Sequence, residues 1–253
     1  MPDFLSPLFD AASAEGMAFL CIGVALAGLV RGFSGFGAAL VYVPFAAQVL
    51  TPFEVLTTLI IMDLIGPLPL VPQMWRKCHP RDVLRLVGGM ALLLPVGLWL
   101  LSLIAPEVFR YLVSGITIIL LFFLICGVRY PGELKKYMIW MSGAFGGFLA
   151  GVAGLPGPPV ILLYMASQHA VAVVRANIFL YLLLTDVFML AVLWAYGELV
   201  PSAIWTGLVI TPAYLLANVA GAAIFRPEFE RGYRILAYLV IGCAALSGLP
   251  LWD

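Results

Sequence analysis

Long apolar stretches, separated by short polar connections, make up most of the chain. A helix needs about 20 consecutive apolar residues to cross the hydrocarbon core of a bilayer. The stretches fall into two groups of five, at 14–31, 35–50, 54–74, 83–104 and 107–128, then at 137–154, 157–168, 172–197, 201–225 and 233–250. This pattern predicts an all-α integral membrane protein with about ten segments in one transmembrane domain. The first repeat would occupy residues 1–128 and the second residues 129–253.

The second stretch of each group is short for a membrane crossing. As helices, 35–50 and 157–168 would rise only about 24 and 18 Å, against roughly 30 Å for the hydrocarbon core. We therefore predict short, broken helices at segments two and seven. The pattern leaves open whether they span the membrane or return as hairpins with the stretches before them.

The basic connections all lie at odd positions along the chain. They follow the third, fifth and ninth stretches and contain Arg76, Lys77, Arg81, Arg129, Lys135, Lys136, Arg226, Arg231 and Arg234. Cytoplasmic loops of membrane proteins carry an excess of Lys and Arg. These connections are therefore predicted to face the cytoplasm, which places both termini outside and fits an even number of crossings.

Small and polar residues recur at a fixed offset of 119 residues, which indicates an internal repeat. The offset pairs Gly28, Gly32 and Gly35 with Gly147, Gly151 and Gly154, and it pairs Thr58 with Asn177. A repeat of five segments crosses the membrane an odd number of times, so its second copy starts from the opposite side. The sequence thus predicts two inverted repeats of about five membrane segments each.

Each group of glycines leads into a sequence that interrupts a helix. Residues 32–37 read Gly-Phe-Ser-Gly-Phe-Gly, and residues 151–159 read Gly-Val-Ala-Gly-Leu-Pro-Gly-Pro-Pro. Matching interruptions in two inverted halves are typical of transporter binding sites. Free amides at helix N-termini favour anions, so a small oxyanion is the expected ligand. The alternative for the glycines is close helix packing, although the prolines of the second interruption cannot continue a helix.

Two carboxylates are predicted near the centres of equivalent third segments, Asp63 in 54–74 and Asp186 in 172–197. An Asp at a helix centre costs about 2.5–3.5 kcal/mol on insertion, so it usually faces a cavity and marks a functional path. One hypothesis is that these carboxylates carry protons coupled to transport. The alternative is that a neutral or paired Asp holds helices together.

Other polar residues lie close to the interruptions. Arg175 and Asn177 begin the eighth stretch and are candidates for contact with the anion, and Thr58 corresponds to Asn177. Of the two histidines, His169 ends a short stretch while His79 lies in a basic connection. Only His169 is therefore expected to be close enough to an interruption to matter.

On these motifs, the chain resembles the TauE/SafE family of sulfite exporters. The resemblance covers nearly the whole chain and is carried by glycine-rich openings at 28–44 and 146–159, followed by polar helix starts at 57–58 and 175–177. It implies two repeated halves that move sulfur oxyanions, organosulfonates or related organic anions. The run at 155–159 departs from the family pattern because it is richer in proline.

The expected function is a secondary transporter that exports a small anion across the bacterial inner membrane, coupled to the proton gradient. The substrate-binding candidates are Gly32, Ser34, Gly35, Gly37, Thr58, Gly154, Gly157, Arg175 and Asn177, and the proton-coupling candidates are Asp63 and Asp186. A passive anion channel is the main alternative. A membrane-embedded enzyme is less favoured, because neither histidine lies near a Glu or a nucleophile on one helical face.

Composition removes several other classes of protein. Hydrophobic residues make up 64% of the chain, charged residues 10%, and the formal net charge is zero, so the basic surface of a nucleic-acid binder is missing. The four cysteines have no spacing typical of a disulfide framework or a zinc site. We expect no cofactor, metal or catalytic residue, and as partners the anion and the lipid bilayer, with a homodimer left open. The N-terminus lacks the basic start of a signal peptide, so the first stretch is expected to remain in the mature protein.

Overall fold

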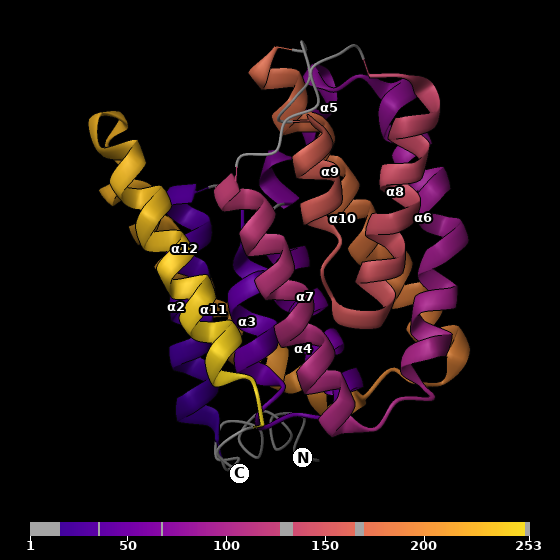
Figure 1. The fold of residues 1–253 in the computed structure, drawn as a ribbon, viewed down its shortest axis with the longest axis vertical. Coiled ribbons are helices and arrows are strands. Elements are labelled where there is room, and N and C mark those ends of the chain that lie inside the picture. The colour runs from indigo at the N-terminus through magenta and orange to yellow at the C-terminus, as the bar shows by residue number, and fades with distance from the viewer. Residues whose placement is uncertain (1–15, 35, 67, 127–133, 165–169, 251–253) are drawn as a thin grey trace, which may run out of the picture. The chain divides into compact units, whose positions relative to one another are not determined.

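A computed structural model describes residues 16–34, 36–66, 68–126, 134–164 and 170–250 (Figure 1). Every regular element in these ranges is a helix. The α-helices are α2 (Met17–Ser34), α3 (Ala38–Ala46), α4 (Pro52–Ile65), α5 (Val71–Lys77), α6 (Pro80–Leu101), α7 (Pro106–Cys126), α8 (Lys136–Ala153), α9 (Gly157–Tyr164), α10 (Val171–Tyr196), α11 (Pro201–Ile224) and α12 (Glu230–Ser247). Two short 3-10 helices lie at Leu68–Leu70 and Pro227–Phe229.

Among the described residues, five helices are long and apolar enough to cross a membrane. They are α2, α6, α7, α10 from Ala172, and α11, and Gly232–Ser247 in α12 is a shorter apolar helix. Large apolar side chains on their outer faces are exposed, such as Trp194 at 75% and Leu216 at 73%. Such faces are stable in contact with lipid, so the predicted all-α membrane protein is confirmed. The inverted relation of its halves stays a prediction.

The two short segments are confirmed as short helices that follow interruptions. Helix α3 has nine residues and starts after Gly37, whose φ of 90° is a left-handed conformation that suits glycine. Helix α9 has eight described residues and follows Gly154, which ends α8 with φ 69°. At about 1.5 Å per residue, these helices rise only about 14 and 12 Å. The predicted extension of segment seven to residue 168 lies outside the described residues.

The prediction of one continuous segment over 54–74 is wrong. Helix α4 ends at Ile65, and α5 begins at Val71 after a 3-10 turn. The sequence from 66 to 72 is Gly-Pro-Leu-Pro-Leu-Val-Pro, and its three prolines lack the N–H donors that an uninterrupted helix needs. The predicted basic connection at 75–82 is also shorter than expected, because α5 continues to Lys77 and α6 starts at Pro80.

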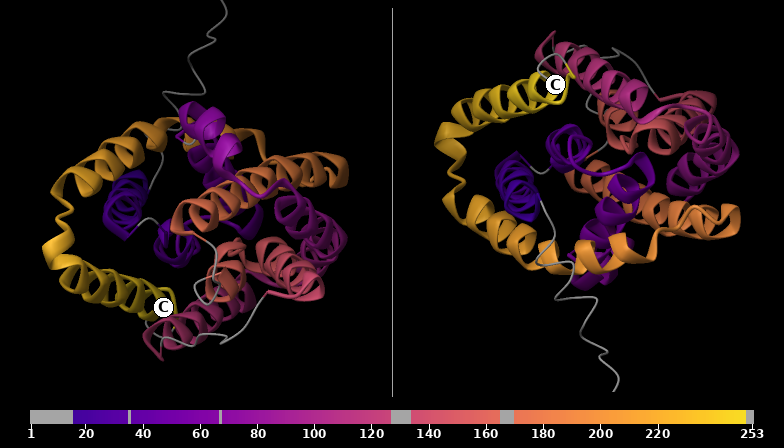
Figure 2. Two further views of the ribbon diagram at one scale, coloured as in Figure 1. Left: turned by 90° about the horizontal axis from the view of Figure 1, so that it is seen from above. Right: turned by 90° about the horizontal axis from the view of Figure 1, so that it is seen from below.

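The helices form two compact units, which we describe separately. Unit 1 comprises residues 1–62, 105–121 and 198–253, and unit 2 comprises residues 63–104 and 122–197. The main packing contact of unit 1 joins α2 to α11, and that of unit 2 joins α6 to α8 (Figure 2). Each unit therefore combines helices from both sequence halves.

Glycines allow the backbones to approach closely in both contacts. A Cβ added to Gly221 of α11 would lie 3.2 Å from the Cα of Gly32 in α2. A Cβ added to Gly97 of α6 would lie 3.1 Å from the Cα of Gly151 in α8. Close packing is thus one role of the repeated glycines, and direct contact of Gly32 with substrate stays a prediction.

These contacts predict that Gly147→Ala lowers the stability of the protein. The added Cβ would lie 2.6 Å from the Cα and the carbonyl oxygen of Met90, so α6 and α8 must move apart. We expect a loss of about 1–3 kcal/mol, or a fall of roughly 2–10 °C in Tm, measured by thermal unfolding in detergent.

The matched control is Gly115→Ala in α7, where no described atom lies within 4 Å of the added Cβ. Its Tm should stay the same or rise slightly, because alanine is the better helix former. An equal fall in Tm for both variants would contradict the role given to Gly147.

Candidate functional site

The interruption in unit 1 leaves the start of α3 without a side-chain cap. Gly37 is the N-cap of α3, and no described side chain caps this end by a hydrogen bond. Every residue from Gly37 to Leu40 has a backbone N–H, so this end offers several donors. Ser34 ends α2, and its hydroxyl lies 2.5 Å from the carbonyl oxygen of Val30 and 2.7 Å from that of Phe36. Ser34 therefore closes the end of its own helix, and the predicted site residue Gly35 lies outside the described residues.

A buried hydrogen bond lies one turn beyond this helix start. The hydroxyl of Tyr42 in α3 donates to Oγ1 of Thr58 in α4 at 2.7 Å, and both side chains are fully buried. The Thr58 hydroxyl lies 2.8 Å from the carbonyl oxygen of Glu54, to which it donates. Both hydroxyls therefore have hydrogen-bond partners within the protein, which is what apolar surroundings require.

The interruption in unit 2 differs chemically from the one in unit 1. Gly154 ends α8 and donates its N–H to the carbonyl of Ala150 at 2.8 Å. Helix α9 then starts at Gly157, but Pro156, Pro158 and Pro159 have no N–H. The expectation of a helix start rich in free amides is therefore wrong for α9. Gly157 is the one residue of 156–159 with an amide to offer.

Unit 2 nevertheless has its own buried pair between its short helix and the next α-helix. Asn177 in α10 is fully buried, and its Nδ2 donates to the hydroxyl of Tyr164 in α9 at 3.3 Å. Its Oδ1 accepts the backbone N–H of His79 at 2.8 Å. In both units, then, a buried tyrosine of the short helix is bonded to a buried polar residue of the next α-helix. The offset of 119 residues relates the two polar residues, Thr58 and Asn177.

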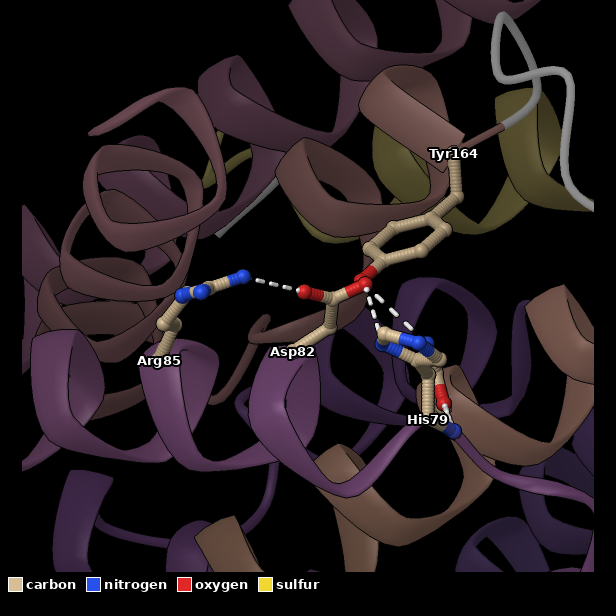
Figure 3. A network of polar contacts seen from close by, with 5 residues as sticks. His79, Asp82, Arg85 and Tyr164 are labelled. Carbon is tan, nitrogen blue, oxygen red and sulfur yellow. Dashed lines mark hydrogen bonds and ion pairs between the residues drawn. The ribbon is translucent and has the colours of Figure 1, made fainter. Parts of the chain in front are cut away.

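A charged network adjoins the Asn177 pair (Figure 3). Asp82 is 3% exposed, its Oδ1 lies 2.6 Å from Nη1 of Arg85, and its Oδ2 lies 3.2 Å from Nδ1 of His79. The ring of Tyr164 is directed toward Asp82 and His79 (Figure 3). A carboxylate with two hydrogen-bonded partners is much less costly to bury than an isolated one.

The expectation that only His169 matters for the anion site stays a prediction, but His79 is the N-cap residue of α6 and part of this polar network. The spacing of three residues from His79 to Asp82 and again to Arg85 would have indicated it, since such residues are neighbours on a helix surface. His169 itself lies outside the described residues.

The remaining candidates have different surroundings. Asp186 is near the middle of α10 and 7% exposed, as predicted, but the prediction that Asp63 lies near a helix centre is wrong because α4 ends at Ile65. Asp63 is half-buried, and both carboxylates have polar interactions. Arg175 is exposed in the second turn of α10. Within the described ranges, no group of three or more His, Cys, Asp or Glu side chains is arranged to hold a metal ion.

The hydrogen bonds of Asn177 predict that Asn177→Ala loosens the junction of α5 and α6. The substitution removes one hydrogen bond of the Tyr164 hydroxyl and leaves the His79 N–H without this acceptor, at about 1–3 kcal/mol for an unsatisfied N–H. Hydrogen–deuterium exchange in residues 74–83 should become several-fold faster. Asn218→Ala in α11 makes the same chemical change in unit 1 and should leave exchange in this segment as in the wild type. Unchanged exchange in Asn177→Ala would show that the bond does not hold the junction.

Comparison with known proteins agrees with this architecture. No curated protein and no solved structure matches the chain. The family model described as Sulfite exporter TauE/SafE matches residues 20–248, which contain both short helices and both buried pairs. The match extends over most of the chain, which therefore belongs to the TauE/SafE sulfite exporter family of membrane transporters.

Proposed function

We propose that this protein is a secondary transporter that exports a small anion across the bacterial inner membrane in exchange for, or together with, protons. The substrate class is sulfite, an organosulfonate or a related organic anion. Family membership supports transport of an anion. The positive connections support an orientation with both termini outside.

The observation that carries the proposal is the recurrence of a buried tyrosine pair beside an interrupted helix. Tyr42 and Thr58 form it in unit 1, and Tyr164 and Asn177 form it in unit 2. Interrupted helices are tolerated at membrane depth only when protein or a water-filled cavity surrounds them. A structural protein needs neither interruption, whereas a carrier needs polar groups that can exchange their internal hydrogen bonds for bonds to a substrate.

The start of α3 is the proposed anion site of unit 1. Its uncapped amides, from Gly37 onward, supply donors and the positive end of the helix dipole. The hydroxyls of Tyr42 and Thr58 lie one turn further along and would become neutral donors to the anion by giving up their present bonds to Thr58 and to the Glu54 carbonyl. Neutral donors suit a transported ion, because a permanent ion pair would hold it too tightly for release.

Asp186 is the proposed proton carrier, with Asp63 as its counterpart in the other half. Asp186 lies 15 residues into the 26-residue helix α10 and is almost fully buried. Ionisable residues at this depth commonly form proton paths in transporters. A carboxylic acid that gains and loses one proton in each cycle would link the anion's movement to the proton gradient.

Transport in proteoliposomes tests the proposal. Sulfite, thiosulfate, a short sulfonate and acetate are offered with and without a pH gradient. We expect the gradient to drive accumulation of at least one anion by the wild type. Asp186→Asn keeps the size of the side chain but cannot ionise, so it should abolish gradient-driven accumulation while exchange of the anion persists.

Glu107→Gln is the matched control, because this exposed carboxylate lies in the first turn of α7. It should accumulate the anion as the wild type does. Anion leak that is independent of the gradient in wild type and Asp186→Asn alike would contradict coupled transport and establish a channel.

A second experiment tests the Tyr42–Thr58 pair. Thr58→Val removes a hydroxyl in the proposed site, and one hydrogen bond to a charged ligand is worth about 1.5–3 kcal/mol. The KM for the anion should therefore rise by about tenfold or more. Thr211→Val is the control, because the Thr211 hydroxyl in the same unit is bonded to the carbonyl of Gly207 at 2.7 Å. Equal changes in KM for both variants would exclude the pair from the binding site.

A further inference from the structure

Unit 2 has an apolar groove on its outer face that the transport proposal does not use. The groove has a volume of about 260 Å³ and is formed by α5, α6 and α10. Its lining includes Trp75, Cys78, Pro80, Leu84, Val87 and Leu184. Leu84 is 73% exposed, so the groove opens outward rather than into the interior of the unit.

The floor of the groove is a packed cluster that fixes its shape. Met74 of α5, Val83 of α6, and Ala176 and Leu180 of α10 form this buried cluster. Lining side chains such as Val87 pack directly on it. Because three helices contribute to the floor, the groove exists before any ligand arrives.

Exposed positive charges lie around the junction of α5 and α6, next in the sequence to residues that line the groove. Arg76 and Lys77 are in the last turn of α5, next to Trp75, and Arg81 is in the first turn of α6, next to Pro80. Asp82 is the one acidic residue in the sequence between Asp63 and Glu107. Its carboxylate is buried and bonded to Arg85 and His79, so it does not neutralise the exposed cations.

We propose that this groove binds one anionic phospholipid. An acyl chain would lie along Leu84, Val87 and Leu184, and the phosphate would contact Arg76, Lys77 and Arg81. A membrane-facing groove with an apolar lining fits a hydrocarbon chain. Basic residues beside it select a negatively charged headgroup, which a neutral lipid or an apolar protein surface would not require.

The position of the groove connects lipid binding to the polar network of unit 2. Cys78 and Pro80 line the groove on either side of His79, whose N–H is held by Asn177. A lipid in the groove therefore supports the junction of α5 and α6 from outside, while Asn177 supports it from inside.

Native mass spectrometry of the full chain, purified in detergent and freed of lipid, tests the headgroup contact. We expect one phosphatidylglycerol to bind more tightly than phosphatidylcholine. Arg76→Gln/Lys77→Gln should weaken phosphatidylglycerol binding by about tenfold, because each cation near a membrane surface contributes a several-fold factor. The control Lys135→Gln/Lys136→Gln removes the same charge at the start of α8 and should retain the wild-type affinity. Equal losses in both variants, or no headgroup preference in the wild type, would overturn the proposal.

A second pair of variants tests the acyl-chain groove. Val87→Phe fills it and should weaken binding of both lipids, whereas Leu92→Phe enlarges an exposed side chain of α6 outside the groove and should not. If Val87→Phe instead removes a dimer and leaves lipid binding unchanged, the occupant is a second copy of the chain and the lipid proposal is wrong. Neither readout depends on transport, so these results stand apart from the proposed function.

Discussion

A backbone surrounded by hydrocarbon has no water to bond its amides and carbonyls, and this requirement shapes every part of the protein. It explains why the described regular structure is helical. It also explains why the polar side chains next to the interrupted helices are paired. The chain turns at Gly37 and Gly154, and the buried polar side chains of α3 and α9 are hydrogen-bonded to partners in the helices that follow.

Stable packing of helices in lipid also requires close contact between their backbones, because van der Waals packing replaces the hydrophobic effect between helices there. The Gly32–Gly221 and Gly97–Gly151 contacts meet it in the two units. Both contacts join a helix of one sequence half to a helix of the other. Each polar pair is built within a single half, from a short helix and the next α-helix. Asn177 also accepts the N–H of His79 from the other half, so both packing and this hydrogen bond join the halves.

The sequence predicted the long helices, the two short ones and the correspondence of Thr58 with Asn177, because length, apolar content and a fixed offset are properties of the sequence alone. The prediction from sequence was wrong where a tertiary contact or a run of prolines determined the structure. Apolar composition concealed the break after Ile65, although its prolines were visible. The bond from His79 to Asn177 spans 98 residues, and no local pattern indicates such a partner. The tyrosines of the pairs were not predicted either, because the offset of 119 residues does not relate Tyr42 to Tyr164.

The contact between α2 and α11 also bears on how the protein is made. A ribosome synthesises α2 early and α11 near the end, so the glycine face of α2 enters the membrane long before its partner exists. During that interval another helix with small residues can occupy it. The packing surface of α6 lacks its partner for a shorter time, because α8 is synthesised soon after α6. The order of synthesis therefore favours completion of unit 2 first, and a ribosome that stalls before α11 would leave unit 1 with an unpaired surface that membrane proteases and chaperones can recognise.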